Sequence, residues 1–162
     1  MLGYFNDQKA TESSFNSTGW FMTGDLGWID ENGFLRITGR KKDLIIRGGH
    51  NIYPVKIETL AMQHPAVDKA VAFAVPDERL GEKVCLAVVR RAGQILSDED
   101  LLQHLDAVGL SKYDMPEFLV DLEAVPLTAS GKILKRDLAE RLAAGTLALR
   151  AVKFQPRSGA AS

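Results

Sequence analysis

The residues best suited to chemistry include a basic segment that is followed by two glycines. Five basic residues lie from Arg36 to Arg47 with one acid, Asp43, so this short segment carries about four net positive charges. Such a cluster can bind an anion. The glycines, Gly48 and Gly49, can adopt φ > 0 and let a ligand approach without meeting a Cβ. The pattern is equally typical of a solvated basic face that ends in a hairpin turn, so spacing alone leaves both interpretations open.

Short strands and turns must position these residues. Runs of β-branched and apolar residues predict strands over residues 26–30, 34–38, 44–46, 67–75, 83–91 and 118–122. The first two strands are separated by Glu31, Asn32 and Gly33, which form a good hairpin turn. The sequence therefore predicts a hairpin near its beginning and a larger set of strands after it.

Three helices are expected between and after these strands. The first begins at Pro54 and ends at Pro65. The second has Ser97 as its N-cap, three acids in its first turn and an apolar stripe that ends before Gly109. The last helix follows the loop at Gly131, and one of its faces carries Leu134, Leu138 and Leu142.

The order of these elements predicts an α+β fold, in which helices pack on a small mixed or antiparallel sheet. We place the domain boundary just after Gly39. Residues 1–39 are expected to form an incomplete β region. Residues 3–17 show the hydrophobic period of neither a helix nor a strand, so we expect a loop there. The hairpin that follows would be only marginally stable in water by itself. Residues 40–145 form the compact domain. Residues 146–162 are predicted to be a flexible tail, since Ala, Gly and Ser accumulate there without a clear helix end.

The composition excludes several classes of protein. The 162 residues are 46% hydrophobic and 25% charged, with a formal net charge of −1, which gives no general attraction to nucleic acid or to an anionic membrane. The single cysteine, Cys85, excludes a disulfide framework and suits a buried apolar position. The longest apolar runs, Ala70 to Val75 and Val84 to Val89, are too short to span a bilayer, and the N-terminus lacks the layout of a signal peptide. We therefore expect a cytoplasmic protein.

Four segments, in order, resemble the motifs of one enzyme family. Residues 19–25 resemble a Thr-Gly-Asp nucleotide motif, and residues 39–58 resemble a hinge motif. Residues 113–116 and 126–132 resemble the last two motifs of the same family. On these matches the sequence resembles the C-terminal portion of the AMP-forming acyl-CoA synthetases, in the adenylate-forming superfamily.

The resemblance implies an enzyme that works in two steps. It activates a carboxylic acid with ATP, which Mg²⁺ accompanies, to give an acyl adenylate and pyrophosphate, and then transfers the acyl group to the thiol of coenzyme A. The family carries its phosphate loop and acyl pocket in a large N-terminal domain, and this sequence contains neither. Residues 1–39 then correspond to the end of that domain, and residues 40–145 to a mobile lid. The missing N-terminal domain is the expected partner, the chain alone is expected to be inactive, and the acid is not identified.

The resemblance also implies roles for single residues. Lys132 corresponds to the catalytic lysine, whose ammonium group stabilises the charge that builds on phosphate oxygens. Asp25 is similar to a ribose-binding aspartate, and Arg40 to a nucleotide-contacting arginine. Without the resemblance, Lys132 suits a helix start, Asp25 suits a turn beside Gly24, and Arg40 suits a surface ion pair with Asp43.

A hinge and a coenzyme A face are implied in the same way. Lys42 occupies the hinge position, where one residue absorbs a large change of φ and ψ as the lid turns between two orientations. Lys132 then faces the site during adenylation. The turn at Gly48 and Gly49 faces it during thioester formation, beside the pantetheine arm.

Two basic residues depart from the family pattern, which commonly has glutamate at both positions. They are His50 and Lys56. His50 can contact the phosphate or sulfur of coenzyme A, or it can be an exposed turn residue. Lys135 and Arg136, beyond the last motif, are expected to be surface charges. No residue is predicted to bind a metal.

Two other functions remain open. A non-catalytic module that binds a nucleotide or a partner would carry the same basic segment. A peptide-synthetase adenylation fragment is disfavoured because an Ala/Gly/Ser-rich tail, and no carrier domain, follows the last helix.

Overall fold

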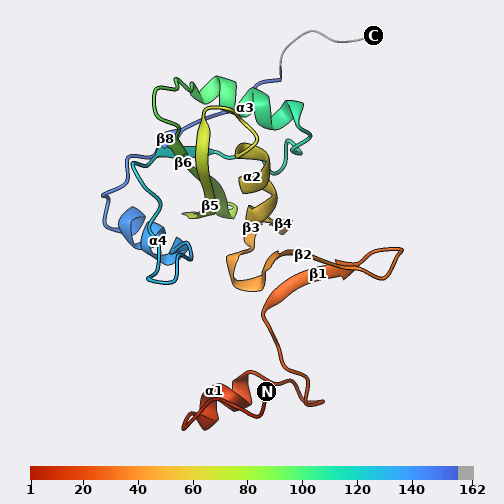
Figure 1. Ribbon diagram of the computed structural model, residues 1–162. Coiled ribbons are helices and arrows are strands. Elements are labelled where there is room, and N and C mark those ends of the chain that lie inside the picture. Colours follow the sequence, from red (N-terminus) through yellow and green to blue (C-terminus); the bar gives the residue numbers. More distant parts are fainter. Residues whose placement is uncertain (157–162) are drawn as a thin grey trace. The chain divides into compact units, whose positions relative to one another are not determined.

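The computed structural model describes residues 1–156 and contains two compact units (Figure 1). The first, Met1–Lys42, holds the helix α1 (Gln8–Ser13) and the antiparallel strands β1 (Asp25–Ile29) and β2 (Leu35–Arg40). The predicted hairpin is confirmed. The predicted loop over residues 3–17 is wrong, because the Asp7 carboxylate accepts the N–H of Ala10 and caps α1.

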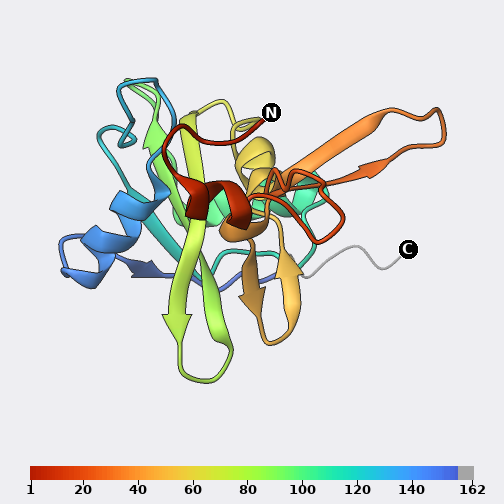
Figure 2. The same cartoon turned by 90° about the horizontal axis from the view of Figure 1, so that it is seen from below.

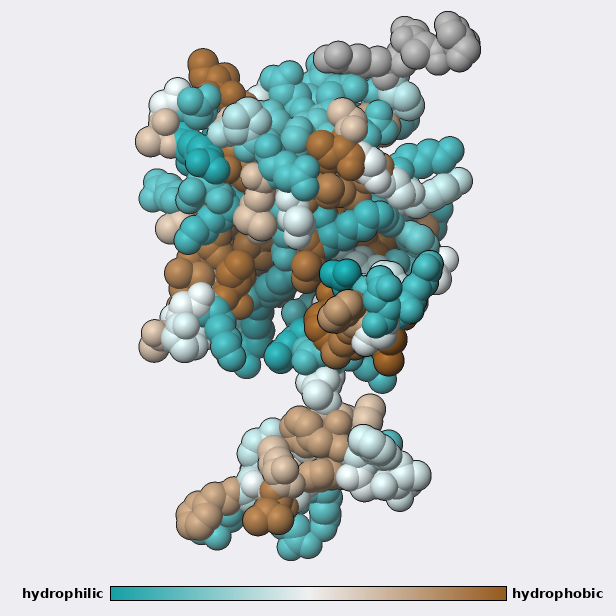
Figure 3. Space-filling view, turned by 45° about the vertical axis from the view of Figure 1, so that its right-hand side comes forward, coloured by the Kyte–Doolittle hydropathy of each residue, from teal (hydrophilic) through white to brown (hydrophobic). Residues whose placement is uncertain are grey.

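The first unit exposes an unusual amount of apolar surface. On and beside its hairpin, five large side chains are more than half exposed: Trp28, Ile29, Phe34, Leu35 and Ile37. Figure 3 shows further hydrophobic surface on the part of the unit that contains α1. Contiguous apolar surface of this kind is typical of a site that contacts another protein, a membrane or a ligand.

The second unit, from Asp43 on, is built around a six-stranded mixed sheet with the path β4-β3-β6-β7-β8, in which β5 also pairs with β6. The β6–β7 pair is parallel and the other pairs are antiparallel, so the predicted α+β class with a small mixed sheet is confirmed. Figure 2 shows the long β5–β6 pair and the β3–β4 hairpin clearly. The strands are β3 (Ile45–Arg47), β4 (His50–Ile52), β5 (Val67–Asp77), β6 (Gly81–Arg90), β7 (Phe118–Asp121) and β8 (Arg150–Ala151), and the helices are α2 (Pro54–Ala61), α3 (Asp98–Ala107) and α4 (Lys135–Ala143).

Side chains of β5 alternate between two hydrophobic cores, as the period of a strand requires. Ala70 and Ala72 face the core that α2 and α3 close, whereas Val71 and Phe73 face the core that contains Leu138 of α4. Figure 1 shows α2 and α3 on one side of the sheet and α4 on the other. The sheet is therefore covered by helices on both faces.

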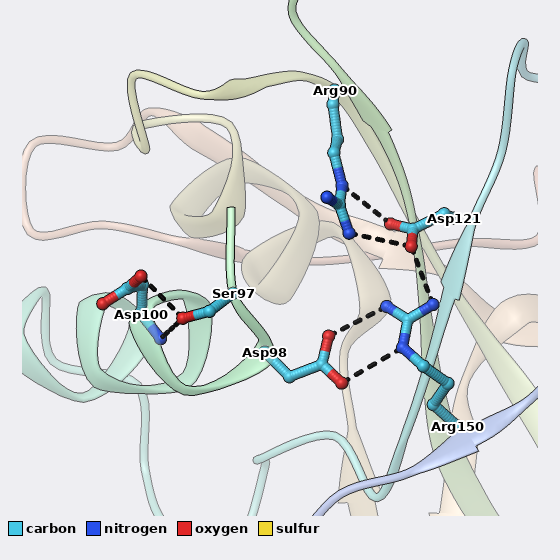
Figure 4. Close-up of polar contacts among 6 residues, drawn as sticks. All are labelled: Arg90, Ser97, Asp98, Asp100, Asp121 and Arg150. Carbon is cyan, nitrogen blue, oxygen red and sulfur yellow. Dashed lines mark hydrogen bonds and ion pairs between the residues drawn. The ribbon is translucent and has the colours of Figure 1, made fainter. Parts of the chain in front are cut away.

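Two further sequence expectations are confirmed in this unit. Ser97 caps α3, since its hydroxyl oxygen accepts the N–H of Asp100 at 3.0 Å (Figure 4). Cys85 is fully buried, and burial raises the pKa of its thiol to about 12. Cys85 is therefore an apolar core residue.

The segment after α4 differs from the predicted flexible tail. Leu147 and Leu149 pack against the core of α4, and Val152 and Phe154 pack against the core of α2 and α3. The short strand β8 pairs with β7 between them. The prediction of a tail is wrong for residues 147–154, because sparse apolar residues in an Ala/Gly-rich stretch still cover both faces of the sheet. The rest of the predicted tail, residues 157–162, lies outside the described residues.

Arg150 fixes this segment through charged contacts (Figure 4). Its guanidinium group pairs with Asp98 at the start of α3 at 2.8 Å and with Asp121 of β7 at 2.7 Å. Asp121 also pairs with Arg90 of β6 at 2.8 Å. Four elements are thereby connected by one network of half-exposed charges.

This network predicts a pH-dependent stability. The hydrogen bonds from Arg150 hold the pKa of Asp98 below its ordinary value of 3.8, so the pair stabilises the fold above that pH and its contribution is lost as the pH falls through the lowered pKa. Arg150→Met is expected to cost about 1 kcal/mol at pH 7, since exposed pairs contribute roughly 0.2–1 kcal/mol each. Urea unfolding from pH 7 to below pH 3 measures the difference, which should shrink at low pH. An equal loss at both ends would contradict the prediction, and Arg136→Met is the exposed control.

Candidate functional site

Lys132 lies in a tightly closed loop before α4. The backbone N–H of Thr128 donates to the carbonyl of Lys132 at 2.8 Å, and the N–H of Lys132 donates to the Thr128 hydroxyl at 2.9 Å. Gly131 has φ +79°, which lets the chain turn sharply there. Lys132 is exposed and makes no ion pair within residues 1–156. The loop therefore holds the backbone in place and leaves the ammonium group available to an anion.

Two basic residues that follow this loop differ from one another. Arg136 is a surface charge, as expected, and pairs with Glu140 on the same helix. Lys135 is not: its ammonium group lies 2.6 Å from Glu58 of α2, and its side chain is only 21% exposed. The prediction of a surface charge is wrong for Lys135, because a partner on a distant helix neutralises it.

Gly48 and Gly49 form the turn between β3 and β4. Their φ angles, +57° and +85°, suit the tight turns that join two strands of a hairpin. A Cβ at Gly48 would meet Leu80, whereas a Cβ at Gly49 would meet no atom within 4 Å. The outer side of Gly49 is therefore open to a ligand.

His50 and Lys56 share one carboxylate beside this turn. The Nε2 atom of His50 lies 2.9 Å from Asp114, and the ammonium group of Lys56 lies 3.5 Å from the other oxygen of Asp114. The ring of Tyr113 meets the His50 ring edge to face. His50 is half exposed, and Asp114 is mostly buried at 14%. Both departures from the family pattern thus belong to one polar cluster.

Sequence reasoning missed Asp114 as the centre of this cluster, although it lies in one of the recognised motifs. A usable signal existed. Two positions that are commonly acidic in the family are basic here, and a paired change of sign points to a shared acidic partner. The hydrogen bond from His50 spans 64 residues, so the partner itself could not be read from local spacing.

Asp25 and Arg40 are brought together in the first unit. They are directly opposed on β1 and β2, and their side chains pair at 3.0 Å. The alternative partner of Arg40, Asp43, is not the one observed. Arg40 also lines a surface hollow with Thr23, Gly24, Lys41 and Lys42. The hollow is basic, which suits an anionic ligand.

Lys42 is exposed in a short 3₁₀ turn, Lys41–Asp43, and the division between the two compact units falls directly after it.

Within residues 1–156, no group of acidic, histidine or cysteine side chains could hold a metal ion. The same residues contain no helix that is long and apolar enough to cross a bilayer.

Comparison with known proteins identifies relatives of this chain. The profile of the AMP-binding enzyme C-terminal domain matches residues 56–132, and so ends on Lys132. The medium-chain fatty-acid–CoA ligase of Escherichia coli is 41% identical over 146 residues, which cover 87% of this chain and 26% of that ligase. This chain is related to the C-terminal portion of the AMP-forming acyl-CoA synthetases.

Solved structures of two enzymes also match this chain. ATP-bound MatB from Rhodopseudomonas palustris matches with a TM-score of 0.80 and 37% identity, over 89% of this chain and 28% of MatB. The o-succinylbenzoate CoA synthetase of Bacillus subtilis, in complex with its acyl adenylate, matches with a TM-score of 0.78 and 38% identity, over 85% of this chain and 28% of that enzyme. The chain thus spans about a quarter of the length of the relatives that it matches.

Proposed function

We propose that residues 40–145 of this chain are the mobile lid of an ATP-dependent acyl-CoA synthetase and that the lid acts on a site held largely by an N-terminal portion. The observation that carries the proposal is the exposed ammonium group of Lys132 in a closed loop, at the last residue of the matched domain. The apolar surface of the first unit supports it, since that hairpin suits contact with the rest of a larger domain.

In the proposed first step, a carboxylate oxygen attacks the α-phosphorus of ATP, and pyrophosphate leaves. Two anions must be held together while negative charge builds on the phosphate oxygens. Lys132 supplies a long, flexible ammonium group to those oxygens. Asp25 accepts hydrogen bonds from the ribose hydroxyls, and Arg40 contacts the nucleotide. In this proposal the nucleotide separates the Asp25–Arg40 ion pair by offering each side chain its own partner.

In the proposed second step, the thiol of coenzyme A attacks the acyl carbon, and AMP leaves. The lid turns about Lys42, so that the Gly48–Gly49 turn replaces Lys132 at the site. The pantetheine arm passes beside Gly49, where no side chain intrudes, and His50 lies next to it. Mg²⁺ accompanies ATP in the N-terminal portion, and we assign it no residue of this chain.

This proposal predicts that the chain alone forms no acyl adenylate. We expect pyrophosphate release only when the chain is joined to, or mixed with, the N-terminal portion of a related enzyme such as the Escherichia coli medium-chain ligase. We call the joined protein the chimera. A continuous pyrophosphate assay with ATP and a panel of carboxylic acids measures this. Robust adenylation by the chain alone, or none by the chimera with any acid, contradicts the proposal.

The same preparations separate the proposal from the alternatives. Titration of ATP, AMP and coenzyme A against the isolated chain tests for a binding module, which would show micromolar nucleotide affinity without an N-terminal portion. Supplying either coenzyme A or a carrier protein as acceptor tests for a peptide-synthetase fragment. Relatives with similar identity are named for different acids, a medium-chain fatty acid and o-succinylbenzoate, so the acid must come from the panel.

A further inference from the structure

An ion pair joins the two helical layers around the free edge of β5. Glu58 lies on α2, which covers one face of the sheet, and Lys135 is the first residue of α4, which covers the other. Their side chains meet at 2.6 Å and are only 12% and 21% exposed. Among the described residues, β5 pairs with β6 alone, so its other edge is open to these side chains.

The same pair satisfies the backbone of Ala72, which is fully buried. The N–H of Ala72 donates to Glu58 Oε1 at 2.9 Å, and the carbonyl of Ala72 accepts from Lys135 Nζ at 3.0 Å. A buried backbone group without a partner is costly, and so is a buried charge without its counterion. The ammonium group of Lys135 is therefore held by two acceptor oxygens, Glu58 Oε1 and the carbonyl oxygen of Ala72. The N–H of Ala72 closes the set of hydrogen bonds through Glu58.

Lys135 also marks the end of the loop that carries Lys132. Within the loop, Leu127 and Ile133 form an isolated bridge, and the N–H of Leu134 donates to the carbonyl of Pro126 at 2.9 Å. Only Ile133 and Leu134 separate Lys132 from Lys135. The point at which the loop enters α4 is thus held by the ion pair.

We infer that the Glu58–Lys135 pair is a positioning device for Lys132, which aims the loop during adenylation and has no part in thioester formation. This inference rests on the proposed function. A long ammonium side chain on a loop needs a fixed base, because a displacement of about 1 Å can cost on the order of 10²-fold in rate. Lys135 touches no substrate in this account.

The chimera tests the inference through its two half-reactions. Lys135→Met is expected to slow pyrophosphate release on the order of 10²-fold, and to leave unchanged the rate at which a supplied acyl adenylate is converted to thioester. Glu58→Gln should act in the same direction. Lys135→Arg should restore most of the rate, since arginine keeps donors for both oxygens. Arg136→Met, on the same helix but exposed, is the matched control and should change neither rate.

Hydrogen exchange on the complete chain alone provides a second readout that needs no catalysis. Lys135→Met should speed amide exchange over residues 127–134 on the order of tenfold or more, and Arg136→Met should not. Unchanged exchange, equal slowing of both half-reactions, or unchanged adenylation would overturn the inference. A parent chimera without adenylation would instead count against the proposed function, and exchange would still decide whether the pair fixes the loop.

Discussion

Lys132→Ala in the chimera is expected to lower the rate of acyl adenylate formation on the order of 10²- to 10³-fold, the usual cost of losing one electrostatic contact to a charge that develops in the transition state. The expected loss is confined to the first step. The loop is closed by backbone and Thr128 contacts that alanine keeps, so the fold should be unaffected. Pyrophosphate release measures the first step, and thioester formation from a supplied acyl adenylate measures the second.

The matched control for this change is Lys69→Ala, which removes an exposed lysine from β5. It should leave both steps at the parent rate. If Lys69→Ala slows them as Lys132→Ala does, the loss comes from the change of net charge and not from the position of Lys132. Full adenylation by Lys132→Ala would remove the basis of the proposed function. Equal loss in both steps would contradict the assignment of Lys132 to adenylation alone.

The larger elements could be predicted because each carries a local signal. Ser97 with three acids after it marks the start of α3, and the continuous apolar run of β5 is followed by Pro76 and Asp77. The missed elements are short. The helix α1 has six residues and no buried face, so no apolar period exists to detect. The strand β4 has three residues, directly after the glycine pair, and is too short to show the period of a strand.

The site could be predicted where one residue acts from a loop, and not where a contact joins distant segments. The exposed loop position of Lys132 follows from the turn at Gly131. By contrast, the bond between Lys135 and Glu58 spans 77 residues and exists because two helices meet at one strand edge. Such a pairing depends on the complete tertiary fold. The same reason explains why the packed segment with Arg150 resembled a tail in the sequence.

The turn at Gly49 should show the opposite selectivity to Lys132. Gly49→Leu places a branched side chain on the open side of the turn, where we propose that the pantetheine arm passes. We expect thioester formation from a supplied acyl adenylate to fall on the order of 10²-fold, because the thiol is displaced from the acyl carbon. Pyrophosphate release should stay near the parent rate, since the turn faces away from the site in that step.

Backbone strain must be separated from this steric effect, because Gly49 has φ +85° and any L-residue there is strained. Gly93 provides the matched control, with φ +74° and no atom within 4 Å of a Cβ. Gly93→Leu should cost similar stability in urea unfolding and leave thioester formation intact. If Gly93→Leu slows that step as much as Gly49→Leu does, strain and not access explains the loss. If Gly49→Leu forms thioester at the parent rate, coenzyme A does not approach the lid at this turn.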